Sequence, residues 1–171
     1  MNELVLALSY LALAAVAWTN KYKYMLALNI VACALCGIYL LLSSAYVGAV
    51  VSSVAALSNF IQLILPSGKV KKRLMKRNII AVFFACSVSM FLYAKPSDIA
   101  PCLAFSINRL SEAQENTQII RYGLILSAAL WSYYGLQHEL WIFVIAELAV
   151  LLLIIAKIWN YKTDPKPILT P

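Results

Sequence analysis

Seven long apolar stretches, joined by short polar connections, constrain this chain more than any other feature. They cover residues 4–18, 24–42, 45–65, 79–94, 99–110, 119–136 and 140–159. A membrane-spanning helix needs about 20 apolar residues, with a range of roughly 17–25. The second, third, sixth and seventh stretches meet this requirement, and the brief fifth would need shielding by its neighbours. Because helices satisfy their own backbone hydrogen bonds, we predict an all-α integral membrane protein with seven transmembrane helices.

The composition excludes most other classes. The chain is 63% hydrophobic and 12% charged, whereas soluble domains are roughly half apolar and a quarter charged. Unbroken apolar runs also exclude a β-barrel, whose strands alternate. The net charge of +7 does not indicate nucleic-acid binding, because the cations cluster in short connections beside apolar stretches. We therefore expect the lipid bilayer as a partner, and no nucleic acid.

The distribution of Lys and Arg predicts the orientation. If the N-terminus lies outside, 13 of the 14 cations lie inside, and only Lys95 lies outside. Cytoplasmic connections carry such an excess, so an outside N-terminus and a cytoplasmic C-terminus are expected. The first stretch has an Ala15-Val16-Ala17 sequence that resembles a signal-peptide cleavage site. No Lys or Arg precedes it, however, so we interpret it as a helix.

A basic run lies between the third and fourth stretches. Its cations are Lys69, Lys71, Lys72, Arg73, Lys76 and Arg77. One interpretation is that the run only holds a connection on the cytoplasmic side. The other is that it binds anionic lipid headgroups.

The two halves of the chain resemble each other at an offset of 95 residues. Residues 26–64 then align with 121–159 without a gap, with six identities. The predicted organisation is a three-helix bundle (1–66), a basic loop and linker helix (67–95), a second three-helix bundle (96–162) and a cytoplasmic tail (163–171). A single linker helix gives the two bundles the same orientation in the membrane. Such a parallel repeat is a layout used by transporters, whose substrate site lies near the midplane of the bilayer. Receptors and assembly factors also reuse such scaffolds.

A possible binding surface lies on the sixth stretch. Ser127, Trp131, Tyr134 and His138 are spaced 4, 3 and 4 residues apart, so they share one helix face. Trp and Tyr can stack on a sugar, a ring or a cation. The alternative is that these aromatic residues pack the bundle and anchor its outer edge.

Glu147 lies within the most apolar part of the last stretch. An ionised carboxylate at the centre of a membrane helix costs at least ~2.5 kcal/mol, so the side chain is expected to face the interior. Arg109 and Arg121 are candidate partners, but both are expected near the inner face, at a distance. The alternatives are a pathway residue and a structural acid that bonds to a neighbouring helix.

The layout resembles the SWEET sugar transporters and the wider PQ-loop group, and overall the chain is most similar to the YgjV-type bacterial inner-membrane proteins. "SAALWSYYGL" (127–136) carries the sharpest match, and Glu147 stands sixteen residues after Trp131, where SWEETs place an Asn. The resemblance implies that Ser127, Trp131 and Glu147 line a pocket. The 95-residue offset adds Cys36 and Ser52. The first half has neither the Trp nor the Asn, so sugar specificity does not carry over.

From these features we expect a carrier for a small polar solute in the bacterial cytoplasmic membrane, in which Glu147 either couples transport to protons or selects a cationic solute. Asn59 shares a face with Ser52 and joins Trp131, Ser127, Tyr134 and Glu147 as a candidate binding residue. The alternative is a non-transporting scaffold, lipid-binding or assembly protein. No enzyme, cofactor or metal signature is found, and the four cysteines fit buried thiols. The oligomeric state stays open.

Overall fold

The computed structural model describes residues 2–64, 71–114 and 116–163, and every regular element in these ranges is helical. The elements are α1 (Asn2–Trp18), α2 (Tyr22–Leu42), α3 (Tyr46–Ile64), α4 (Lys71–Phe91), the short 3-10 helix η1 (Pro96–Asp98), α5 (Ile99–Glu112), α6 (Thr117–Gln137) and α7 (Trp141–Thr163). The prediction of an all-α chain is confirmed for the described residues.

The structure differs from the prediction at the basic run. The expected loop before residue 79 is largely helical, because α4 already begins at Lys71. Lys, Arg, Leu and Met are good helix formers, and they extend the apolar stretch backwards by two turns. Five of the six predicted headgroup-binding cations therefore lie on α4, namely Lys71, Lys72, Arg73, Lys76 and Arg77. Lys69 lies outside the described residues.

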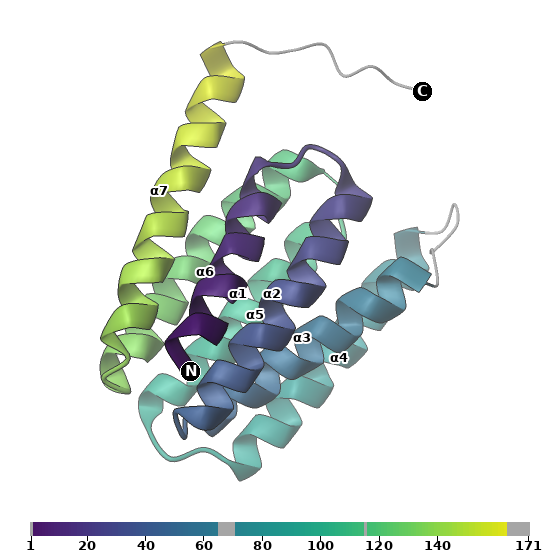
Figure 1. The fold of residues 1–171 in the computed structure, drawn as a ribbon. Coiled ribbons are helices and arrows are strands. Elements are labelled where there is room, and N and C mark those ends of the chain that lie inside the picture. The colour runs from purple at the N-terminus through teal and green to yellow at the C-terminus, as the bar shows by residue number, and fades with distance from the viewer. Residues whose placement is uncertain (1, 65–70, 115, 164–171) are drawn as a thin grey trace.

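Successive long helices run in opposite directions, so the connections gather at two ends of the bundle (Figure 1). We call the end with the α1–α2, α3–α4 and α5–α6 connections the basic end, and the opposite end the turn end. Hydrogen bonds between residues at the same end agree with this arrangement. At the basic end, Arg121 reaches Asn20, and at the turn end Lys95 donates to the carbonyl of Gln137.

Six helices form a ring around a common interior, and α4 lies outside it. Around the ring α1 contacts α2, α2 contacts α3, α3 contacts α5, α5 contacts α6, α6 contacts α7, and α7 returns to α1. The main contacts of α4 are with α3 and α5. The ring places residues of six different helices around one interior site.

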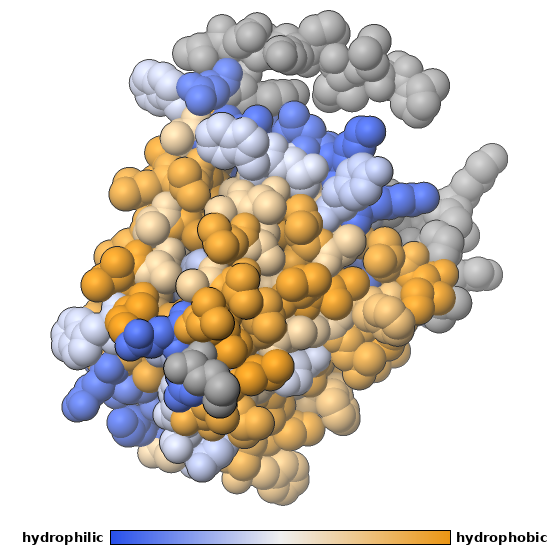
Figure 2. All heavy atoms as spheres, viewed as in Figure 1, coloured by the Kyte–Doolittle hydropathy of each residue, from blue (hydrophilic) through white to orange (hydrophobic). Residues whose placement is uncertain are grey.

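The surface identifies a membrane protein. The helices α2, α3, α4 and α7 are long and apolar enough to span a bilayer, whereas α1 is apolar but has only 17 residues. Large apolar side chains such as Leu11, Phe83 and Leu152 are more than 60% exposed. Figure 2 shows hydrophilic residues at the two ends and a hydrophobic band between them. This pattern suits contact with lipid tails rather than water.

The two turn-end hairpins match residue by residue at the offset of 95. α2 covers Tyr22–Leu42 and α6 covers Thr117–Gln137, so both ends of the two helices correspond. Ser44 and Glu139 occupy equivalent places and both have φ 59°, a conformation that L-residues rarely adopt. Ala45 donates its amide proton to Leu40, and Leu140 donates to Gly135 in the same way, each at 2.9 Å. The backbone thus repeats more clearly than the side chains do.

Candidate functional site

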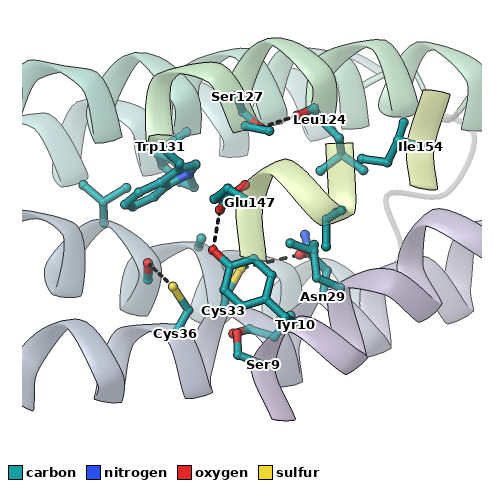
Figure 3. Close-up of a pocket in the computed structure, with 18 residues that line it drawn as sticks. Ser9, Tyr10, Asn29, Cys33, Cys36, Leu124, Ser127, Trp131, Glu147 and Ile154 are labelled. Carbon is teal, nitrogen blue, oxygen red and sulfur yellow. Dashed lines mark hydrogen bonds between the residues drawn. The ribbon is translucent and has the colours of Figure 1, made fainter. Parts of the chain in front are cut away.

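A cavity of about 70 Å³ lies inside the ring of six helices (Figure 3). Its eighteen lining residues come from α1, α2, α3, α5, α6 and α7, and none comes from α4. Most of the lining is apolar, and a few polar groups project into it. The cavity is therefore the place in which the two halves of the chain face each other.

Glu147 on α7 enters this cavity and is 5% exposed. Its Oε1 accepts a hydrogen bond from the hydroxyl of Tyr10 on α1 at 2.8 Å (Figure 3). Arg109, one of the two cations considered from the sequence, instead pairs with Glu112 on its own helix. The acid is thus held by a neutral hydroxyl donor from a neighbouring helix, which is cheaper than leaving it unpaired in a low-dielectric interior.

Trp131 and Ser127 on α6 form the opposite wall. The indole of Trp131 packs edge-on against Tyr134 and Phe143, with ring centroids 5.8 and 6.0 Å apart. These neighbours hold the ring beside the cavity. The hydroxyl of Ser127 donates to the carbonyl of Leu124 at 3.1 Å, so its oxygen remains available as an acceptor.

The first half contributes thiols and small polar groups. Ser52 on α3 donates to the sulfur of Cys36 on α2 at 3.9 Å. One turn away on α2, the thiol of Cys33 donates to the side-chain oxygen of Asn29 at 3.5 Å. Figure 3 shows both cysteines and Asn29 on the wall that faces α6 and α7. These groups offer weak donors and acceptors without a charge.

Two predicted binding residues lie outside the cavity lining. Tyr134 is fully buried, and its hydroxyl oxygen accepts the amide proton of Gly48 at 3.1 Å. It therefore joins α6 to α3 through packing. Asn59 is also fully buried, and neither its amide nitrogen nor its oxygen has a hydrogen-bond partner. Trp131, Glu147, Ser127 and Ser52 do lie together around the cavity.

Sequence reasoning missed Tyr10 and Cys33 as cavity residues. A signal existed for Tyr10, because it stands in the middle of the first apolar stretch while the other aromatic residue of that stretch, Trp18, stands at its end. A mid-membrane tyrosine needs a partner for its hydroxyl. Nothing in one sequence indicates that this partner is an acid 137 residues away.

A buried polar cluster lies between the halves at the basic end. Arg109 on α5 donates to the hydroxyl of Ser58 on α3 at 3.2 Å. Its partner Glu112 accepts from the amide of Asn29 on α2 at 3.3 Å. The hydroxyl of Tyr22 donates to the backbone carbonyl of Glu112 at 3.3 Å. These bonds tie α5 to α2 and α3.

Arg121 makes a second connection at the same end. Its guanidinium donates to the carbonyls of Ala17 and Thr19 at 3.3 and 3.1 Å, and to the side chain of Asn20 at 2.7 Å. These acceptors lie where α1 ends, so the arginine covers carbonyls that the helix leaves unpaired. The bonds tie α6 to α1.

Asn29 and Leu124 stand between the cavity and the basic end. Both line the central cavity, and both also line a smaller space that contains Tyr22 and Glu112. The two residues are related by the offset of 95. The two residues therefore lie between the cavity and the polar cluster.

At the turn end, Asp98 joins η1 to the two residues before it and to His138 at the end of α6. One carboxylate oxygen accepts the amide protons of Ala94 and Lys95, both at 2.9 Å, and the other lies 3.0 Å from Nε2 of His138. Burial raises the pKa of Asp98, but the two amide bonds and the His138 contact outweigh it, so the pKa lies below its ordinary value. His138 thus has a partner in the fold.

The described residues contain no group of three or more His, Cys, Asp or Glu side chains placed to hold a metal ion. Of the predicted headgroup-binding cations on α4, Lys76 is exposed and Arg77 is half-buried. The side chains of Lys71, Lys72 and Arg73 are outside the described part.

Comparison with protein-family models, with curated proteins and with solved structures finds no match for this chain.

Proposed function

We propose that this protein is a carrier for a small polar solute, and that the solute binds in the central cavity. The observation that carries the proposal is the internal symmetry of the lining. Fourteen of its eighteen residues form seven pairs at the offset of 95. Examples are Cys36 with Trp131 and Ser52 with Glu147. A cavity built twice over, by two repeats that face each other, is the arrangement expected of a repeat transporter.

The order of helix contacts supports a two-fold relation between the units α1–α3 and α5–α7. In such a relation α1 corresponds to α5 and α3 corresponds to α7. The contact between α3 and α5 then corresponds to the contact between α7 and α1, and both are present. Such a relation fits the 3+1+3 plan with α4 as linker. Seven spans in a bacterial cytoplasmic membrane, with an external N-terminus, belong to the same proposal.

Alternating access is the proposed mechanism, and we assign the structure to a closed state of the cycle as part of the same proposal. The cavity, at about 70 Å³, is much smaller than the roughly 300 Å³ at which ligand pockets usually begin. Arg109 and Arg121 close the basic end, and the bond from Gly48 to Tyr134 joins the halves toward the turn end. Separation of the units at one end at a time would admit and release the solute.

The chemistry of the lining favours a cationic or proton-coupled cargo. Glu147 is the sole carboxylate among the eighteen lining residues, and none of them is Lys or Arg. The indole of Trp131 adds a π-face that attracts cations. A carboxylate can bind a cationic group of the solute directly, or it can take up and release a proton during each transport cycle. Both roles need the ring to open to water.

A thermal-stability screen tests the proposal. Purified protein is heated with a panel of small metabolites, organic cations included, at two pH values. We expect at least one compound to stabilise the protein, and Trp131→Ala to abolish the shift. Trp141→Ala is the matched control, because that indole is 61% exposed at the start of α7. A panel without a hit, or a shift that survives Trp131→Ala, contradicts binding in this cavity and favours the scaffold alternative.

A further inference from the structure

α4 packs against α3 at the edge of the ring (Figure 1). A groove lined by residues of these two helices is a second hollow in the molecule. This groove has a volume of about 270 Å³ and shares no lining residue with the central cavity. Its walls come from one face of each helix. Leu57 and Ile61 on α3 and Ile80 and Phe84 on α4 are among its lining residues, and all four are at least 39% exposed. The groove therefore opens sideways, toward the lipid.

The lining changes character along the groove. Arg77, Gln62 and Asn78 line it toward the basic end, whereas Phe84 lines it two turns further from that end. At 1.5 Å per residue, Arg77 and Phe84 are about 10 Å apart along the axis of α4. A polar mouth that leads into an apolar slot has the polarity of a phospholipid.

Charge complementarity specifies the headgroup. Arg77 is the one charged residue among the lining residues of the groove, and no Asp or Glu is among them. Two neutral lining side chains bond to Arg109: Asn78 donates to its carbonyl at 2.8 Å, and Ser58 accepts from its guanidinium. Lys76, which precedes Arg77 on α4, is exposed. The mouth therefore favours an anion.

We propose that the groove binds one anionic diacylphospholipid, with the phosphate at Arg77 and an acyl chain along α4 as far as Phe84. A free phosphate would leave the apolar slot unfilled. A zwitterionic headgroup would bring its amine toward the same cation. This site is independent of the carrier proposal, because the groove and the cavity have separate linings.

Native mass spectrometry of the full chain tests the site. The protein is reconstituted in phosphatidylcholine bilayers that contain a titrated fraction of phosphatidylglycerol, and the lipids retained after mild extraction are counted. We expect one phosphatidylglycerol per chain, and Arg77→Gln to weaken its retention about fivefold, the effect of about one cation near a charged surface. Lys76→Gln is the matched control, because it removes the same charge from the neighbouring exposed position. It is expected to have a smaller effect.

A second pair of variants tests the slot without changing charge. Ala81 lines the groove beside Phe84, so Ala81→Leu should fill it and reduce retention. Phe83→Leu, on the 73% exposed lipid face, should not. Equal losses from Arg77→Gln and Lys76→Gln would show general surface attraction and overturn the site. Equal retention of phosphatidylcholine, or retention that Ala81→Leu leaves unchanged, would also overturn the site. A dimer that Ala81→Leu dissociates would show that a second copy fills the groove, and this result would overturn the lipid site as well.

Discussion

The bond between Tyr10 and Glu147 gives the most specific prediction about the cavity. Tyr10→Phe removes the hydroxyl that donates to Glu147 at 2.8 Å. The ring stays, packed edge-on against Phe143 with centroids 5.9 Å apart. A typical hydrogen bond contributes roughly 0.5–1.5 kcal/mol net, and those between membrane helices average about 0.6 with a maximum near 1.7 kcal/mol. We therefore expect Tyr10→Phe to lower the free energy of unfolding by about 1 kcal/mol.

A double-mutant cycle measures whether the two side chains share that energy. Glu147→Met removes the acceptor at similar volume, so Tyr10→Phe should cost about 1 kcal/mol less in this background. Glu147→Gln keeps a carbonyl oxygen, and there the cost of Tyr10→Phe should persist. Tyr133→Phe, at a 47% exposed position on α6, is the control and should show no coupling. The assay is reversible unfolding in mixed micelles. A coupling energy below ~0.3 kcal/mol would refute the reasoning, because independent sites add within that error.

Three further predictions concern contacts toward the two ends of the bundle. Asp98→Asn should lower the melting temperature at pH 7. The lowered pKa of Asp98 means that its ionised form stabilises the fold above the ordinary Asp pKa, so the difference from wild type should shrink as the pH of the melt falls through the folded pKa. Gly48→Ala should destabilise the fold by ~1–3 kcal/mol, since a Cβ there would lie 2.7 Å from Cε1 of Tyr134, and Gly37→Ala should cost less because its nearest atom is a serine hydroxyl at 3.1 Å. Arg121→Met should cost at least ~1.5 kcal/mol, the lower bound for bonds to a charged group, and an unchanged unfolding curve would contradict its closing role.

The sequence was sufficient for the helices because their signals are local. Apolar runs of known length mark them, and the matching hairpins at Ser44 and Glu139 follow from the same offset that the sequence suggests. The start of α4 was missed because a run of cations reads as a solvated loop. Lys71 and its neighbours instead continue the helix, since charged side chains do not oppose helix formation at a membrane surface.

The candidate site was only partly accessible from one sequence. Ser127 and Trp131 share a face of α6, so their common direction follows from helical spacing. Which helix stands opposite does not follow from spacing. Tyr134 lies on the same face, yet it ends against Gly48 on α3. Tyr10 reaches Glu147 only because α1 and α7 close the ring. Such pairings are decided by tertiary packing, and single-helix patterns carry no information about them.

The native thiol of Cys36 offers the most direct measurement of alternating access. Cys36 lines the central cavity, and a charged methanethiosulfonate reagent modifies only thiols that reach water. In a variant with Cys33, Cys86 and Cys102 replaced by serine, the reagent is applied to intact cells and, separately, to inverted membrane vesicles, with a cysteine-free variant as the blank. Our account predicts slow modification of Cys36 from both sides. Modification from neither side, or from one side alone, would contradict a cavity that opens alternately to each.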